Sequence, residues 1–178
     1  MSVLAERLLA VDAALDRAGL AHAFGGAIAL AYCTHEPRGT RDLDVNVFIK
    51  PDRADEALDA LPDGVSVSKA ERAAARRKAQ VRVMWEDTPI DLFFDAHDFH
   101  REVAESVTRV PFEGATIPVL GCEALIVFKA MFNRTRDWAD IEAVLSAGAA
   151  DCGKVLARLR SLLGPSDAAA HRFAELCR

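Results

Sequence analysis

The fold is decided by residues 25–50, GGAIALAYCTHEPRGTRDLDVNVFIK. The glycine pair follows a short, partly apolar stretch, residues 21–24, which we interpret as a strand. It precedes the apolar run AIALAYC, residues 27–33, which we interpret as a helix. THEPRGT, residues 34–40, contains Pro and Gly and predicts a loop. Residues 42–49, DLDVNVFI, alternate and are rich in β-branched side chains, which predicts a second strand.

This second predicted strand carries two carboxylates among apolar residues. Side chains alternate between the faces of a strand, so Asp42 and Asp44 share one face with Asn46. Their Cα atoms should lie about 7 Å apart, from a rise of about 3.3 Å per residue. Burial would raise both pKa values unless a cation stood between the carboxylates, and Mg²⁺ prefers such oxygen ligands. Two solvated aspartates at a strand edge are the alternative, which the spacing alone leaves open.

A later predicted strand carries a third carboxylate. In TPIDLFFD, residues 88–95, Asp91 interrupts an apolar strand. Three aspartates from two strands can converge on a pair of metal ions, an arrangement that stabilises attacking and leaving oxygens at phosphorus. Asp95 lies at i+4 from Asp91, where the strand should end, and we interpret it as a helix cap.

The glycine pair fits the same chemistry. At a turn from strand to helix, Gly25 and Gly26 would let backbone N–H groups approach a phosphate closely. The helix N-terminus adds the positive end of a dipole. A glycine pair alone is most often only a turn, and its position before a helix and two aspartates gives it weight here.

The rest of the chain predicts an α+β fold in two parts. Residues 1–120 mix helices with strands, including two candidate hairpins over residues 81–95 and 106–120. Residues 121–178 show only helical patterns, with breaks near Asn133 and Gly148. We therefore expect a small mixed sheet flanked by helices, followed by a C-terminal helical bundle in the same compact unit.

Composition narrows the class of protein. The chain has 178 residues, 51% of them hydrophobic and 28% charged, and a net charge of -5. This is a globular composition without a general attraction for nucleic acid. No stretch resembles a signal peptide or a membrane span, so we expect a cytoplasmic protein. The four cysteines have no metal-binding spacing, and we expect them to be reduced thiols.

Three motifs together resemble a known superfamily. GGAIAL, then RGTRDLDVNV, then PIDLFF are similar to the motifs of nucleotidyltransferases of the DNA polymerase β type. The resemblance spans roughly residues 20–146. The stretch CEALIVFKAMFNRTRDWADIEAVL, residues 122–145, resembles the helical segment of the AbiEii/AbiGii-type toxin nucleotidyltransferases. The gap between Gly26 and Asp42 is long for the superfamily.

The resemblance implies Mg²⁺-dependent transfer of a nucleoside monophosphate from an NTP to an acceptor hydroxyl. Asp42 and Asp44 would hold the metal ions, two of them, and Asp91 would be the third ligand or would activate the acceptor. The residues expected at the nucleotide phosphates are Gly25, Gly26, Arg38, Thr40 and Arg41. Lys129 would neutralise negative charge at the nucleotide, and Asp140 would position Lys129 or the acceptor. A solvent-directed Lys129 is the alternative.

The acceptor is left open by the sequence. The toxin-like segment implies the tRNA 3′ end as acceptor and an antitoxin protein as partner. The alternatives are a small-molecule (antibiotic) acceptor, a protein acceptor, and a nucleotide-binding module without turnover. A basic helix over residues 69–80, with Arg72 and Arg76 on one face, is either a solvated surface or an RNA-binding patch. Thr135 and Asp137 are expected to cap the helix that contains Asp140.

Overall fold

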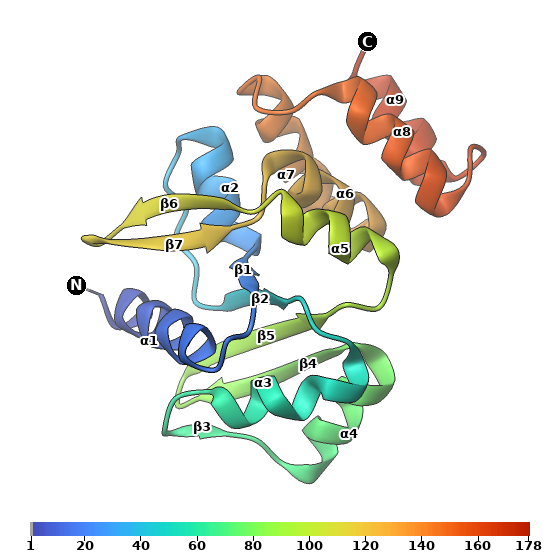
Figure 1. Ribbon diagram of the computed structural model, residues 1–178. Helices are drawn as coiled ribbons and strands as arrows, with labels where there is room; N and C mark the ends of the chain where they lie inside the picture. The colour runs from blue at the N-terminus through green and yellow to red at the C-terminus, as the bar shows by residue number, and fades with distance from the viewer. Residues whose placement is uncertain (1) are drawn as a thin grey trace. The chain divides into compact units, whose positions relative to one another are not determined.

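The computed structural model describes residues 2–178 and confirms the α+β fold (Figure 1). Its helices and strands are α1 (Val3–Arg17), β1 (His22–Phe24), α2 (Gly26–Thr34), β2 (Leu43–Val47), η1 (Pro51–Arg53), α3 (Ala54–Ala60), β3 (Val65–Ser66), α4 (Lys69–Lys78), β4 (Gln80–Trp85), β5 (Thr88–Phe94), α5 (Asp98–Glu105), β6 (Thr108–Phe112), β7 (Ala115–Val119), α6 (Cys122–Phe132), α7 (Thr135–Ser146), α8 (Cys152–Leu163) and α9 (Ala168–Leu176).

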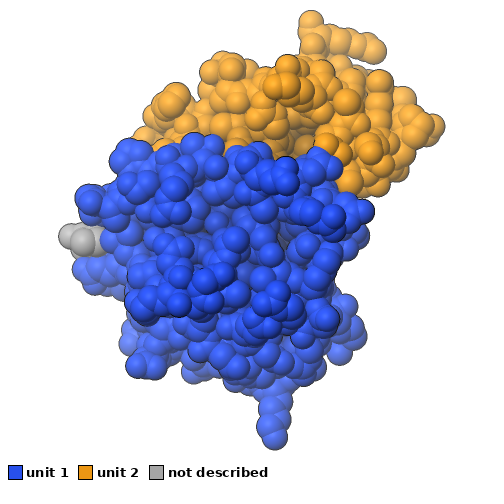
Figure 2. All heavy atoms as spheres, viewed as in Figure 1, with its two compact units in different colours: residues 1–28, 39–120 blue, residues 29–38, 121–178 orange. Residues whose placement is uncertain are grey.

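Two compact units divide the chain, shown in different colours in Figure 2. The first consists of residues 1–28 and 39–120, and the second of residues 29–38 and 121–178. The boundary near residue 28 falls inside α2, so a short N-terminal segment belongs to the otherwise C-terminal unit.

The first unit is built on one mixed sheet with the strand order β3-β4-β5-β2-β1-β7-β6. Strand β2 runs parallel to β5, and β1 runs parallel to β7, while the other neighbours are antiparallel. One side chain row of β2, namely Leu43, Val45 and Val47, is fully buried. Each such side chain contributes roughly 1.5–3 kcal/mol through burial, and this row fixes which face β2 turns to the core.

Both predicted hairpins are confirmed. Strands β4 and β5 are joined by a two-residue turn at Glu86 and Asp87, and Glu86 has a positive φ of 52°. Strands β6 and β7 are joined at Glu113 and Gly114, which have φ values of 48° and 83°. Positive φ angles of this kind match the right-handed twist of hairpin strands.

The second unit is helical, as predicted for its C-terminal part. Helix α6 contacts α7, α8 and α9, and α8 contacts α9. The predicted break at Asn133 is confirmed, since this residue ends α6 in the left-handed conformation with φ 54°. No helix among residues 2–178 combines the length and the apolar character needed to cross a membrane.

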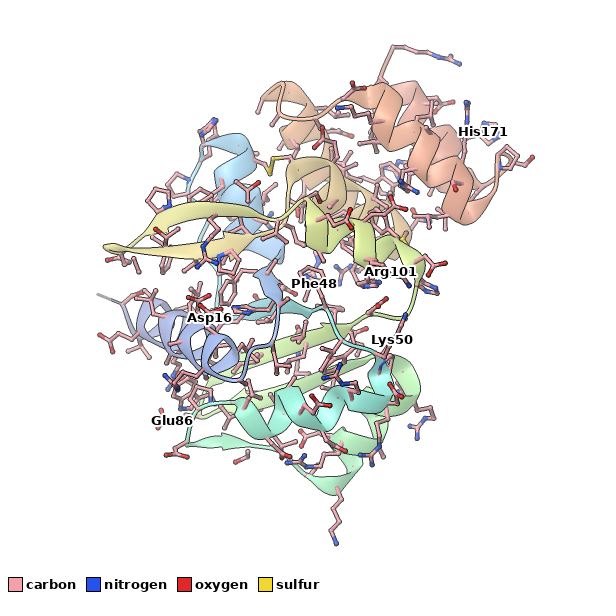
Figure 3. The ribbon with its side chains drawn as sticks, in the orientation of Figure 1. Asp16, Phe48, Lys50, Glu86, Arg101 and His171 are labelled. Atoms are coloured by element: carbon pink, nitrogen blue, oxygen red, sulfur yellow. A yellow bond between two sulfur atoms is a disulfide. The ribbon has the colours of Figure 1, made fainter. Side chains whose placement is uncertain are left out.

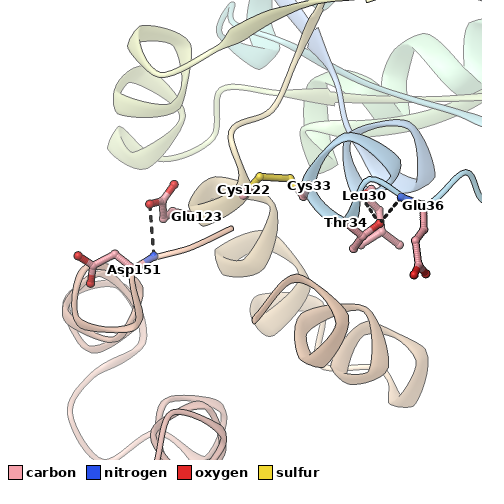
Figure 4. The surroundings of a disulfide bond; sticks show 7 residues. All are labelled: Leu30, Cys33, Thr34, Glu36, Cys122, Glu123 and Asp151. Atoms are coloured by element: carbon pink, nitrogen blue, oxygen red, sulfur yellow. Dashed lines mark hydrogen bonds between the residues drawn. A yellow bond between two sulfur atoms is a disulfide. The ribbon is translucent and has the colours of Figure 1, made fainter. Parts of the chain in front are cut away.

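The cysteines correct one expectation. We expected reduced thiols, but the structure joins Cys33 to Cys122 and Cys152 to Cys177. Figure 4 shows the first disulfide, with a hydrogen bond of 3.4 Å nearby from the Asp151 backbone N–H to Glu123. Both disulfides lie within the second unit, and the first unit contains no cysteine. Their positions depend on tertiary packing, which the wide spacing in the sequence does not reveal.

Candidate active site

Three polar side chains form a row across neighbouring strands of the first unit. Asp44 on β2 lies opposite Asp91 on β5, and Asp91 lies opposite Arg82 on β4. Residues paired in this way share a face of the sheet. Asp91 is only 6% exposed, whereas the Arg82 side chain is 57% exposed. The row therefore brings two of the predicted carboxylates together and adds a cation that the sequence did not single out.

Arg82 binds Asp91 through two hydrogen bonds. Its Nε donates to Oδ1 at 2.8 Å, and its Nη2 donates to Oδ2 at 2.5 Å. Charge-assisted pairs of this two-point kind are the strong ones. The hydrogen bond to Asp91 raises the pKa of Arg82 well above its usual value, partly opposed by desolvation, with further contributions from Asp42 and Asp44. The Arg82 guanidinium therefore stays charged at any physiological pH.

Asp42, the residue immediately before β2, lies near the same guanidinium. Its Oδ2 lies 3.9 Å from Arg82 Nη2, so Asp42 and Asp91 flank one cation. The Thr40 hydroxyl donates a hydrogen bond of 2.6 Å to Asp42 Oδ1. Thr40 thus orients a candidate metal ligand. Arg41 is exposed beside it.

The glycine pair packs directly against Asp44. Gly26 begins α2 with φ 50°, and a Cβ built on it would lie 1.8 Å from Asp44 Oδ2. The Gly25 N–H donates to the Asp44 carbonyl oxygen at 2.8 Å. The pair therefore gives the Asp44 carboxylate room at the start of a helix, and only a residue without a side chain fits at position 26.

Lys129 and Asp140 form a buried ion pair in the second unit. Lys129 Nζ lies 2.6 Å from Asp140 Oδ2 and 3.8 Å from Asp137 Oδ1. Lys129 and Asp140 are each 8% exposed. Arg38, which we expected at the nucleotide phosphates, forms a salt bridge with Asp140 instead. Lys129 is thus paired with carboxylates rather than directed to solvent.

Asp137 caps α7, although not in the predicted partnership. Its Oδ2 accepts a hydrogen bond of 3.1 Å from the Arg134 backbone N–H, and the N-cap residue is Arg134 rather than Thr135. Burial raises the pKa of Asp137, but hydrogen bonds from Arg134 and the charge of Lys129 outweigh this effect, so the pKa lies below its usual value. The capping role of Asp137 is confirmed, and that of Thr135 is wrong.

Asp95 is not a helix cap either. Helix α5 begins at Asp98 with His97 as its N-cap, and Asp95 Oδ2 lies 3.0 Å from Lys50 Nζ. Lys50 follows β2 and carries an exposed side chain (Figure 3). The pair connects the residues that follow β2 and β5.

Two arginines of the basic helix α4 are paired with acidic side chains within the first unit. Arg72 lies 3.2 Å from Asp55 and 2.7 Å from Asp59, and Arg76 also pairs with Asp55. Hydrogen bonds to Asp59 and Asp55 raise the pKa of Arg72. The face of α4 that suggested RNA binding is therefore occupied by acidic side chains of α3.

The carboxylates fit a divalent cation by chemistry and position. They offer hard oxygen donors, and two of them lie in register on adjacent strands. Among residues 2–178, no three His, Cys, Asp or Glu side chains are gathered closely enough to form a metal-binding group. At Asp91, Arg82 binds both carboxylate oxygens.

Comparison with known proteins identifies solved structures with the same fold. No protein-family model and no curated protein sequence matches the chain. A solution structure of the antibiotic-resistance factor ANT(2'')-Ia matches with a TM-score of 0.63 at 14% identity and covers 97% of both chains. The chain has a nucleotidyltransferase fold. A crystal structure of ANT(2'')-Ia with adenylyl-2''-tobramycin also gives 0.63, at 13% identity, over 99% of this chain and 100% of the other.

Two further structures share the nucleotidyltransferase fold. The lincomycin-bound lincosamide antibiotic adenylyltransferase LnuA matches with a TM-score of 0.54 at 14% identity, over 80% of this chain and 96% of that chain. An antigenic nucleotidyltransferase-like protein from Paracoccidioides brasiliensis gives 0.53 at 15% identity, over 96% and 94%. At these identities the similarity establishes the fold, while activity and substrate remain to be argued from the site.

Proposed function

We propose that this protein transfers a nucleoside monophosphate from an NTP to an acceptor hydroxyl with the help of Mg²⁺. The observation that carries the proposal is the alignment of Asp44 with Asp91 on one face of the sheet, with Asp42 beside them. Gly26 lets the Asp44 carboxylate lie close to the N-terminus of α2, the end of a helix whose backbone N–H groups favour a phosphate. A nucleotidyltransferase fold supports the same conclusion.

In this proposal each site residue has a defined task. Asp42, Asp44 and Asp91 would hold two Mg²⁺ ions, which supply positive charge to the phosphates of the nucleotide when bound. Thr40 orients Asp42, and exposed Arg41 is available to a phosphate. The acceptor hydroxyl loses its proton as its oxygen bonds to the α-phosphorus, and pyrophosphate leaves with the bond electrons; where Asp91 is not the third metal ligand, it is the base that takes this proton.

A small molecule is the acceptor that the structure favours. The arginines that suggested RNA binding are paired with Asp55 and Asp59, which leaves α4 with little free positive charge on that face. The net charge of -5 also disfavours binding of the negatively charged RNA backbone. The fold similarity to the antibiotic-resistance factor ANT(2'')-Ia and to the lincosamide antibiotic adenylyltransferase LnuA extends over most of each chain.

A tRNA acceptor, and a toxin role with an antitoxin partner, is the second candidate. It is favoured by the Lys129–Asp140 pair at 2.6 Å, which joins α6 and α7 in the segment that resembles the toxin nucleotidyltransferases. In this alternative Asp140 positions Lys129, as the resemblance implies.

The test is transfer of label from each of the four α-³²P NTPs with Mg²⁺. The acceptors are a panel of aminoglycosides and lincosamides, total tRNA, and the protein itself. Asp44→Asn is expected to reduce transfer about 1,000-fold, equivalent to about 4 kcal/mol of transition-state stabilisation. Asp98→Asn, at a carboxylate whose side chain is 92% exposed, is the matched control and should leave transfer unchanged.

The labelled acceptor decides between the candidates. Label on a small molecule supports the first, label on tRNA the second, and label on the protein alone indicates protein modification. A folded sample that binds Mg-NTP but labels none of these acceptors would contradict the proposal and favour a nucleotide-binding module.

A further inference from the structure

Arg82 is the positively charged side chain placed directly on the candidate metal ligands. It comes from β4, and its register opposite Asp91 is set by the two-residue turn between β4 and β5. Its guanidinium binds both oxygens of Asp91 and lies 3.9 Å from Asp42 Oδ2. One guanidinium therefore contacts or approaches two of the three carboxylates.

Arg82 and a metal ion would need the same oxygens. A carboxylate oxygen coordinates Mg²⁺ at 2.0–2.1 Å through a lone pair. At Asp91 both oxygens already accept hydrogen bonds from Arg82, at 2.8 Å and 2.5 Å. In addition, a guanidinium beside a divalent cation is repelled by it. Binding of a metal by Asp91 and pairing of Asp91 with Arg82 therefore exclude each other.

The two partners of this pair differ in mobility. Asp91 is 6% exposed and held within β5, whereas 57% of the Arg82 side chain is exposed. Once its hydrogen bonds to Asp91 are replaced, a long, exposed side chain can adopt another rotamer in water, while the buried carboxylate stays in place. Arg82 is thus the partner that can leave.

We propose that Arg82 is a resident counter-ion that occupies the metal position at Asp91 until Mg²⁺ and the nucleotide bind. It neutralises the carboxylates while the metal is absent. The metal displaces it from Asp91, and the released guanidinium turns to the negatively charged nucleotide. The inference rests on the proposed function, because the displacing group is the metal of the transfer reaction. It makes Arg82 a positioning residue that delays full assembly of the site until substrate arrives.

The test measures Mn²⁺ binding without nucleotide, from the electron paramagnetic resonance signal of the free ion. Arg82→Gln removes the competing charge and should tighten Mn²⁺ binding roughly fivefold, the upper range for an exposed ion pair. Arg82→Lys keeps the charge but lacks the two-point geometry, so its Mn²⁺ affinity should lie between those of the wild type and Arg82→Gln. Arg101→Gln is the matched control, since Arg101 is 67% exposed and pairs only at the surface with Asp98.

A thermal melt of the same variants separates this role from a purely structural one. Arg82→Gln should melt below the wild type without metal and gain more from saturating Mn²⁺ than the wild type does. A structural role would lower both melting temperatures equally and leave metal affinity unchanged. Should Arg82→Gln fail to fold, Arg82→Lys serves as the variant, and any tightening of Mn²⁺ binding in it still supports the proposal.

Failure of this inference differs from failure of the proposed function. Equal or weaker Mn²⁺ binding by Arg82→Gln, with binding lost in Asp44→Asn, would overturn the role of Arg82 and keep the metal site. Absence of Mn²⁺ binding above the Asp44→Asn level in every variant would overturn the metal site and, with it, the displacement of Arg82.

Discussion

The two units hold their buried charges in opposite ways. In the first unit, Asp91 pairs with Arg82, whose side chain is more than half exposed. In the second unit, Lys129 and Asp140 are both about nine-tenths buried, and the same unit contains both disulfides. The first arrangement suits a site that must accept new ligands, and the second suits a scaffold that must not move. Four measurements on variants test this difference between the units.

Removal of a disulfide should have the largest effect on stability, and only in the second unit. Cys152 and Cys177 are 25 residues apart, and a crosslink over such a loop contributes roughly 3–4 kcal/mol by limiting the unfolded chain. The double variant Cys152→Ala/Cys177→Ala should unfold at correspondingly lower urea. Trp138, which is 1% exposed in the second unit, reports this in a Trp85→Phe background.

A thiol count in unfolded, unreduced protein provides the control for this prediction. We expect no reactive thiols before reduction and four afterwards. Four reactive thiols in untreated protein would mean that the disulfides are absent and do not distinguish the second unit from the first.

Asp140→Asn should destabilise the protein by about 3 kcal/mol, because it leaves Lys129 buried without its closest counter-charge. The measurement is urea unfolding. Arg38→Gln, which removes the half-exposed partner of Asp140, should cost less than about 1 kcal/mol. If Asp140→Asn keeps full stability but loses transfer activity, Lys129 and Asp140 serve catalysis rather than the stability of the second unit.

Gly26→Ala should cost about 2 kcal/mol and also lower transfer activity. Its φ of 50° disfavours a side chain, and the added Cβ would overlap the Asp44 carboxylate. Gly19→Ala is the matched control in the same unit, because Gly19 also has a positive φ, 68°, but nothing within 4 Å. It should cost about 1 kcal/mol and leave activity intact. Equal effects of the two changes on stability and activity would show that Asp44 can move aside.

The smallest expected effect is an acid sensitivity that originates in the first unit. Burial lowers the pKa of His100, while the charge of Asp95 opposes this and His97 and Lys50 add to it. The unfolded chain then takes up the proton first, so stability is complete above about pH 6.5 and declines as the pH falls toward the lower folded-state pKa.

His100→Gln should remove this decline, by less than about 1 kcal/mol between pH 7 and pH 5. The free energy of unfolding is measured in urea at both pH values. His171→Gln changes an exposed histidine of the second unit and should leave the decline in place (Figure 3). If the free energy of unfolding of His100→Gln falls as much as that of the wild type, a group other than His100 causes the acid sensitivity.

Much of the secondary structure of the first unit could be predicted from the sequence, because it depends on local patterns of residues. Alternation in residues 42–49 predicted β2, and the interruption of an apolar run by Asp91 predicted the third carboxylate. These patterns place residues on a face of their own strand. They do not determine which residue of another strand lies opposite.

Arg82 was missed for that reason, although a signal existed. An exposed arginine in QVRVMW is typical of the solvent face of a strand. The sequence predicted a hairpin over residues 81–95 without identifying its turn, which is Glu86 and Asp87. With the correct turn, the antiparallel register places Arg82 opposite Asp91 directly.

The neutralised basic helix was also readable. Asp55 and Asp59 are spaced by four residues, as are Arg72 and Arg76, so the two helices present matching charges. The pairing of the cysteines was not readable, because Cys33 and Cys122 are 89 residues apart and only the packing of α2 and α6 joins them. The salt bridge of Arg38 with Asp140 was not predictable for the same reason, because the two residues are far apart in the sequence.

The excursion of residues 29–38 into the second unit has a consequence for how the chain can be divided. The glycine pair and the first two aspartates lie on either side of it in the sequence. A cut after residue 120 would remove the bonding partner of Cys33 and the helices with which residues 29–38 are grouped. The motif and the helical region are thus interlaced along the chain, and neither can be inherited, exchanged or lost as a separate module.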